Sequence, residues 1–224
     1  FSSENPQLME EISPALKEYG FHGTLVCTVD EFPLTEMESQ TREKIQKLQE
    51  EGWDFALGGA IGENPETYAE KIQNAWSYFQ DNGFGTIQSL MFNGGDYADG
   101  RDTIYPVISE LGFQLCGGFS SKEGYTSLIS EKDTDYPQIY NCQNISLRED
   151  IGVIKAMAEQ AAYQKKPLIF SDYTLEQSWE NAEAGNLENL RGILQYLKEE
   201  EQVETGNVQE YLEYSTHLEQ TMGE

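Results

Sequence analysis

The sequence predicts an α/β fold, and three observations support this class. Short apolar runs of strand length recur along the 224 residues. Each run is followed by a polar or glycine-rich loop and then by a segment whose apolar residues repeat at helical spacing. About five or six such units of roughly 25–35 residues follow one another, which is typical of a mainly parallel sheet with helices outside. Because the strands are short and buried, we expect a barrel or an incomplete barrel rather than an open doubly wound sheet.

The clearest unit spans residues 51–65. Gly52 is placed to end a helix, because a left-handed residue after the last turn costs glycine little. Residues 53–57 (WDFAL) form an apolar run of strand length that only Asp54 interrupts. Asn64 followed by Pro65 predicts the start of the next helix. The loop between strand and helix lacks side chains at three positions, Gly58, Gly59 and Gly62.

The remaining elements follow from the same signals. We expect helices at residues 8–19, 35–51, 65–82, 102–111, 146–164 and 187–197, with a polar helix at the end of the chain. We expect strands at residues 21–29, 53–57, 86–92, 113–116, 138–142 and 167–170, with a last short strand at 203–205. Capping-box patterns mark two helix starts, at Thr35 with Glu38 and at Ser146 with Glu149. Glycine stops follow four helices, at Gly20, Gly52, Gly83 and Gly112.

The composition limits the classes of function that this protein can have. The length suits one domain with a sizeable core, so residues 1–224 are predicted to form a single domain. Against 40 Asp and Glu residues there are 14 Lys and Arg residues, and the net charge of −26 argues against nucleic acid and membrane surfaces as partners. No apolar run reaches the length of a membrane span, and no phosphate-binding glycine motif follows a strand. The acidity favours a soluble extracellular or cell-surface protein; the oligomeric state is not predicted.

Cysteine and histidine usage argues against a zinc site. Cys27, Cys116 and Cys142 lie in or beside apolar runs without a CxxC pair, so buried free thiols are expected, with one disulfide and one free cysteine as the alternative. The two histidines, His22 and His217, are interpreted as structural or surface residues. A three-histidine zinc site is impossible with two histidines, and we expect neither a bound metal nor a cofactor.

Several segments, in order, resemble the NodB-like polysaccharide deacetylases. They are residues 15–26 (ALKEYGFHGTLV), 47–58 (KLQEEGWDFALG), 89–95 (SLMFNGG) with 107–113 (VISELGF), 167–172 (PLIFSD) and 190–211. The resemblance implies a distorted (β/α) barrel of about seven strands. It also implies an ancestry among enzymes that remove acetyl groups from N-acetylglucosamine polymers or xylan, using a metal held by one Asp and two His. The resemblance places the start of this chain inside or after the first strand.

The chain departs from that family at each catalytic position. Counted from Gly52, the two metal histidines would fall at Gly58 and Gly62, which have no side chain to offer. The Asp-Asp pair would fall at about residues 2–3, both serine, and the general-acid histidine at Ser171. The motif arginine is missing near Asn93. Amide or ester hydrolysis by this route needs a metal-bound water and a base, so the resemblance implies a degenerate site.

Polar side chains nevertheless follow the predicted strands, where a barrel gathers its functional groups. The catalytic candidates are Asp30, Glu31 and Asp172, and the candidates for binding a substrate are Asn93, Asp96, Tyr97, Ser171, Asp172 and Tyr173, with Glu63 and Arg101 nearby. Carboxylates, amides and an aromatic ring suit a sugar. The alternative is that these loops are polar because they meet water. Two carboxylates could also form a glycosidase pair. No loop has the ligand spacing of an EF-hand, which argues against a divalent-cation site. No G-x-S-x-G elbow is present, which argues against a serine nucleophile.

Three functions therefore remain open. The first is a catalytically degenerate deacetylase-like domain that binds a carbohydrate or a protein partner at the barrel mouth. The second is a carbohydrate-active hydrolase, a deacetylase or another carbon–nitrogen or ester hydrolase, with a non-standard site. The third is a structural module of a larger surface protein. Fold resemblance alone does not decide among them.

Overall fold

The computed structural model describes residues 1, 3, 5, 7–32, 39–59, 64–92, 100–119, 131–147, 149–165, 167–171, 187–201 and 203–222. Within these residues the α/β class is confirmed, because strands and helices alternate around one seven-stranded sheet. The strands are β1 (Thr24–Thr28), β2 (Asp54–Gly59), β3 (Ser89–Phe92), β4 (Leu115–Phe119), β5 (Glu131–Lys132), β6 (Tyr140–Ser146) and β7 (Ile169–Ser171).

The sheet is parallel except at one short strand. β1, β2, β3, β4 and β6 pair in that order, all in parallel. The outer edge of β6 is shared by two strands, because β5 pairs with its amino-terminal half in the antiparallel sense and β7 with its carboxyl-terminal half in parallel. The parallel order means that the carboxyl ends of β1 to β4 meet at one edge, as the sequence predicts.

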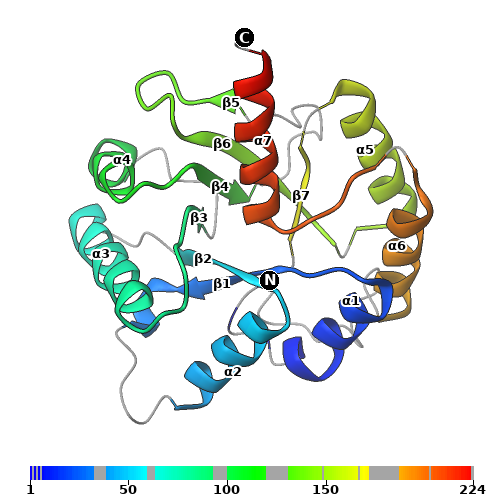
Figure 1. Cartoon of the computed structure of the whole chain (residues 1–224), viewed down its shortest axis with the longest axis horizontal. Coiled ribbons are helices and arrows are strands. Elements are labelled where there is room, and N and C mark those ends of the chain that lie inside the picture. The colour runs from blue at the N-terminus through cyan, green and yellow to red at the C-terminus, as the bar shows by residue number, and fades with distance from the viewer. Residues whose placement is uncertain are drawn as a thin grey trace.

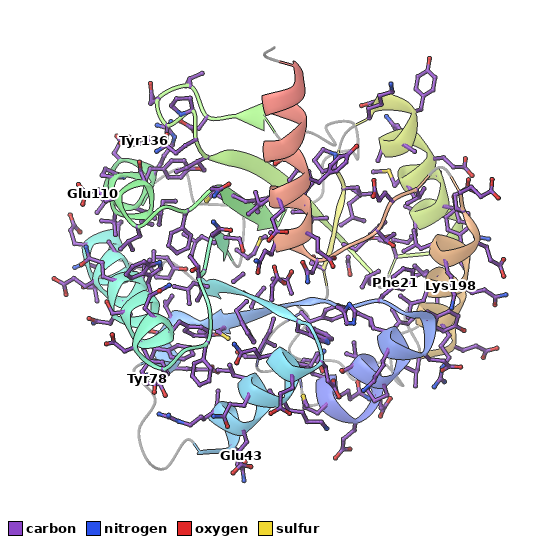
Figure 2. The ribbon with its side chains drawn as sticks, in the orientation of Figure 1. Phe21, Glu43, Tyr78, Glu110, Tyr136 and Lys198 are labelled. Atoms are coloured by element: carbon purple, nitrogen blue, oxygen red, sulfur yellow. The ribbon has the colours of Figure 1, made fainter. Side chains whose placement is uncertain are left out.

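Seven α-helices complete the described chain. They are α1 (Ser13–Tyr19), α2 (Ser39–Glu50), α3 (Pro65–Asp81), α4 (Arg101–Glu110), α5 (Ile151–Gln164), α6 (Leu187–Glu199) and α7 (Val208–Met222). A π-helical turn, Leu8–Ile12, leads into α1, and a short 3-10 turn, Val29–Glu31, follows β1. In Figure 1, α1 to α6 surround the sheet and α7 lies across it. In Figure 2, Glu43 and Glu110 lie on the outer side of this arrangement.

The predicted end of α2 is confirmed. Gly52 has a φ of +87°, and the N–H of Trp53 reaches back to the carbonyl of Leu48 at 3.0 Å. This left-handed turn satisfies helix-end carbonyls and delivers the chain directly into β2. The Trp53 ring then packs so closely on Gly23 that an added Cβ there would lie 2.6 Å from it. The start of α3 is also as predicted, since the Asn64 side chain accepts the N–H of Thr67 at 3.1 Å.

Other local predictions were wrong. α5 begins at Ile151 behind Asp150, whose carboxylate accepts the N–H of Gly152, whereas Ser146 belongs to β6. Residues 203–207 form no strand and instead lead into α7. β5 was not anticipated, because two residues carry no periodic signal. The predicted capping box at residues 35 and 38 lies outside the described residues.

The two faces of the sheet have different covers. One face packs against the surrounding helices through a large core that includes Leu25, Leu57 and Cys116. The opposite, interior face carries a smaller cluster in which α7 supplies Leu212. The strand members of that cluster are Val26, Ala56, Met91 and Leu115. Because alternate residues of a strand face opposite ways, this cluster identifies which residues of each strand belong to the interior face.

The first residues lie along the free side of β1. The N–H of Val26 donates to the carbonyl of Phe1 at 2.6 Å, and the N–H of Ser3 donates to the carbonyl of Val26 at 2.8 Å. This alternation is the pattern of a parallel pair. The Phe1 ring also packs on Trp53, with 5.6 Å between ring centroids. Phe1 and Ser3 therefore occupy the place of a further parallel strand beside β1.

Candidate functional site

The carboxyl ends of four strands bring one row of residues together on the interior face. Thr28 pairs with Gly58, Gly58 with Met91, and Met91 with Gly117. These four residues share a face because paired residues of parallel strands do. Two of the four have no side chain; of the other two, Thr28 is half-buried and Met91 is buried in the smaller cluster.

The backbone after this row is held by a tyrosine. Gly59 has a φ of +122°, which side-chain-bearing residues rarely adopt, and a Cβ there would lie 3.3 Å from the Thr28 methyl group. The carbonyl of Gly59 accepts the Tyr68 hydroxyl at 3.4 Å. Tyr68 is 2 % exposed, and burial raises its pKa, so it stays a neutral donor. Glycine is thus required at the end of β2 for backbone geometry.

Ser171 is the predicted site residue that the structure places most clearly. It ends β7, pairs with Ser146 of β6 and is buried. Its hydroxyl has no hydrogen-bond partner among the residues that the structure describes. Since Ile169 packs with the interior cluster, Ser171 belongs to the same face. A buried hydroxyl without a partner is costly, so this group is suited to bind a ligand.

The two acidic candidates after β1 are already engaged. Asp30 forms an ion pair with Lys71 of α3, and both side chains are about half exposed. Glu31 accepts the hydroxyl of Ser3 at 3.3 Å, and the carbonyl of Ser3 accepts the Lys44 ammonium at 2.6 Å. Both carboxylates lie on the turn that leaves β1, as predicted. Their catalytic role stays a prediction.

The other candidates fall elsewhere. Asn93, Asp96, Tyr97, Asp172 and Tyr173 lie outside the described residues, as do Gly62, Glu63 and the His217 side chain. His22 is exposed just before β1, at the amino end of the sheet, and its ring faces Gly52. Among the described side chains, no group of three or more His, Cys, Asp and Glu is arranged to hold a metal ion.

Arg101 holds a neighbouring loop in place. It begins α4 and donates to both carboxylate oxygens of Asp133 and, at 3.0 Å, to Asp135. Its guanidinium also lies over the rings of Tyr105 and Tyr136, 5.0 and 5.7 Å from their centroids. The Asp133 carboxylate raises the pKa of Arg101 above its ordinary value. Arg101 therefore fastens the loop between β5 and β6 to α4, and Tyr136 marks that contact in Figure 2.

Two thiols are buried and inert. Neither Cys27 nor Cys116 forms a disulfide, and burial raises the pKa of both thiols, that of Cys116 to about 12. A thiol that stays protonated is neither a nucleophile nor a metal ligand. Free buried thiols were predicted for these two residues. The Cys142 side chain lies outside the described part of the chain.

A titratable group at the opposite end of the sheet escaped prediction. Asp54 lies at the amino end of β2 on the interior face and is 8 % exposed. Burial raises its pKa to about 6, although hydrogen bonds from the Thr24 hydroxyl and the Gln209 N–H lower it. In the sequence this residue only interrupted an apolar run. No local pattern in the sequence points to a buried carboxylate there, because its partner Gln209 lies 155 positions away.

Comparison of the chain with family models, with curated proteins and with solved structures gives no match in any of the three. None of the described helices is long and apolar enough to cross a membrane.

Proposed function

We propose that the chain is a catalytically degenerate member of the NodB-like polysaccharide deacetylases that binds a carbohydrate at the carboxyl ends of its strands. The proposal includes a distorted barrel of about seven strands and an extracellular or cell-surface location. The parallel order of the strands, the outer helices and the extra strand-like pairing of Phe1 and Ser3 with β1 support it.

The position of Gly58 carries the proposal. The resemblance puts a metal-binding histidine at this residue, and Gly58 stands on the interior face between Thr28 and Met91. A side chain at this position would project from the carboxyl end of β2, where barrel enzymes place functional groups. Glycine keeps the backbone and removes the ligand. Metal-assisted deacetylation by the family's route has no donor at this position.

The remaining groups suit hydroxyl-rich ligands. Ser171 supplies a buried hydroxyl without a partner in the described structure. Thr28, which is half-buried at the end of β1, also carries a hydroxyl. The sequence adds amide, carboxylate and phenol groups after β3 and β7, namely Asn93, Asp96, Tyr97, Asp172 and Tyr173. Such groups hydrogen-bond sugar hydroxyls, and an aromatic ring can stack on a pyranose face.

Titration calorimetry with N-acetylglucosamine and xylose oligomers tests this function. Thr28→Phe would fill the interior row and should weaken binding at least tenfold. Thr103→Phe is the matched control, because Thr103 is also half-buried but lies on α4, away from the row. Retained folding of both variants is checked by thermal unfolding. Binding that Thr28→Phe leaves unchanged, or no binding of any oligomer, would refute a glycan site at this edge; in the second case a protein partner or a structural role becomes the better account.

A further inference from the structure

The first turn of α7 is held partly by the sheet. A helix leaves its first four N–H groups without partners inside the helix. In α7 these are the N–H groups of residues 207–210. The Glu210 N–H donates to the Asn207 side chain at 2.9 Å, and the Asn207 N–H donates to the Glu210 carboxylate at 2.8 Å. The other two leave the helix: Val208 donates to the Thr24 hydroxyl oxygen at 3.0 Å and Gln209 to the Asp54 carboxylate at 2.7 Å. Docking of α7 therefore uses one side chain from β1 and one from β2.

Asp54 is only half satisfied in this arrangement. Its Oδ2 accepts the Gln209 N–H, whereas its Oδ1 is buried and has no partner among the described residues. Beside it lies a cavity of about 10 Å³, the size of one water molecule, lined in part by Ser89, Gln88 and Leu212. A carboxylate held this way is costly when ionised, because a buried charge needs full pairing. A proton on Oδ1 removes the charge and leaves Oδ2 free to accept from α7.

We propose that α7 is a proton-dependent cover of the interior face, docked most firmly when Asp54 is protonated. Its release would uncover Val26, Ala56, Met91 and Leu115, which Leu212 now covers. The raised pKa of Asp54, about 6, agrees in direction. A group whose pKa is higher in the docked state loses its contribution to docking as the pH rises through that pKa.

Among the described residues, no lysine or arginine forms an ion pair with Asp54. In the described part of the chain, the ionisable groups on the elements packed around it are the amino group of Phe1, His22, Cys27, Glu210, Tyr211, Glu213 and Tyr214. The Phe1 amino group lowers the pKa of Asp54, but less than burial raises it. Glu210 and Glu213 add negative charge on α7 itself and are bonded to Asn207 and Gln209. The side chains that β3 and the residues just before it contribute to the cavity, Thr86, Gln88 and Ser89, are uncharged.

Hydrogen exchange of the α7 amides at pH 5 and pH 8 tests the proposal on the whole chain. After correction for intrinsic exchange, and with α6 amides as the internal reference, protection of residues 208–212 should fall about tenfold between the two pH values. This factor follows from pKa values of about 6 docked and 3.8 undocked. Asp54→Asn, which mimics the protonated acid, should keep the protection and abolish the dependence. Glu213→Gln, a neutralised carboxylate on the same helix, should behave as the wild type.

Equal protection at both pH values in the wild type would overturn the proposal, and so would a dependence that survives in Asp54→Asn. If Asp54→Asn does not fold, carbon-13 NMR of the Asp54 carboxyl group in the wild type decides instead. The expected titration has a midpoint near pH 6 and moves the amide signals of Tyr211 and Leu212 with it. A midpoint near pH 4, or a midpoint that those amides do not follow, would contradict the role given to Asp54.

Discussion

Thr24 and Asp54 are paired residues of β1 and β2, and each accepts one N–H from the first turn of α7. The Thr24 hydroxyl also lowers the pKa of Asp54. Two neighbouring strands thus cap a helix that begins more than 150 residues later, since Gln209 lies 155 positions beyond Asp54. This tertiary cap joins the last helix to the centre of the sheet.

The first prediction concerns Thr24. Thr24→Val keeps the side-chain shape and removes the acceptor of the Val208 N–H, which is partly buried. We expect a loss of about 1–2 kcal/mol of unfolding free energy, the usual effect of losing a helix cap. Urea unfolding measures it. Thr103→Val on α4 is the control and should change stability by less than about 0.5 kcal/mol. An unchanged midpoint for Thr24→Val would mean that its hydroxyl does not hold α7.

The second prediction concerns pH and stability. The folded-state pKa of Asp54 is raised, to about 6 from 3.8. The folded state therefore keeps the Asp54 proton to a higher pH than the unfolded state does. The contribution of Asp54 to stability falls as the pH rises from about 4 through 6. The shift corresponds to roughly 3 kcal/mol at most.

Because many other carboxylates titrate in the same range, the measured quantity is the difference between the wild type and Asp54→Asn. We expect Asp54→Asn to gain stability relative to the wild type between pH 4 and pH 8, in urea unfolding at several pH values. A difference that stays constant over this range would show that Asp54 has an ordinary pKa.

The third prediction concerns Arg101. Arg101→Ala would leave Asp133, whose side chain is 5 % exposed, as a buried carboxylate without its guanidinium. Breaking such a pair costs more than the pair contributes, so we expect a loss of about 2–4 kcal/mol. Lys17→Ala removes the partner of Glu51 in a pair whose lysine is 68 % exposed, and should cost less than about 0.5 kcal/mol. Similar losses in the two variants would contradict the conclusion that Arg101 fastens the loop between β5 and β6 to α4.

The fourth prediction concerns the aromatic core. Phe79 of α3 is fully buried and packs against Phe32, Phe55 and Phe84, with ring centroids 5.1, 5.7 and 5.6 Å away. Phe79→Ala should cost about 3–5 kcal/mol, since it creates a cavity in the layer between α3 and the sheet. Thermal unfolding measures the loss. A drop of less than about 1 kcal/mol would mean that this layer is packed differently.

Sequence reasoning succeeded where short segments decide the structure. The turn at Gly52 and the start of α3 at Asn64 depend on a few neighbouring residues, and both were predicted. Ser146 and Asp150 show the limit: each can cap a helix, and the choice depends on the pairing of Ser146 with Ser171, which extends β6. The partners of Arg101 and Asp54 lie 32 and 155 positions away, so no local pattern reveals them.

The candidate site was predictable only in part. The sequence placed Gly58 and Ser171 at strand ends, because strand length and loop composition locate those ends. It could not show that Asp30 is paired with Lys71 or that Glu31 is bonded to Ser3, since ion pairs of exposed side chains depend on helix placement. The roles of Asn93, Asp96, Tyr97, Asp172 and Tyr173 stay predictions.

Acetate release from acetylated chitooligosaccharides and from acetylated xylan, with Zn²⁺, Co²⁺ or Mn²⁺ added in turn, tests the central claim most directly. The claim is that glycine at position 58 and serine at position 171 leave this protein unable to deacetylate by the metal-dependent route. We therefore expect no acetate above the protein-free background with any of the metals. Metal-dependent release that scales with protein concentration would contradict a degenerate site, and Asp30, Glu31 and Asp172 would then be the first residues to substitute.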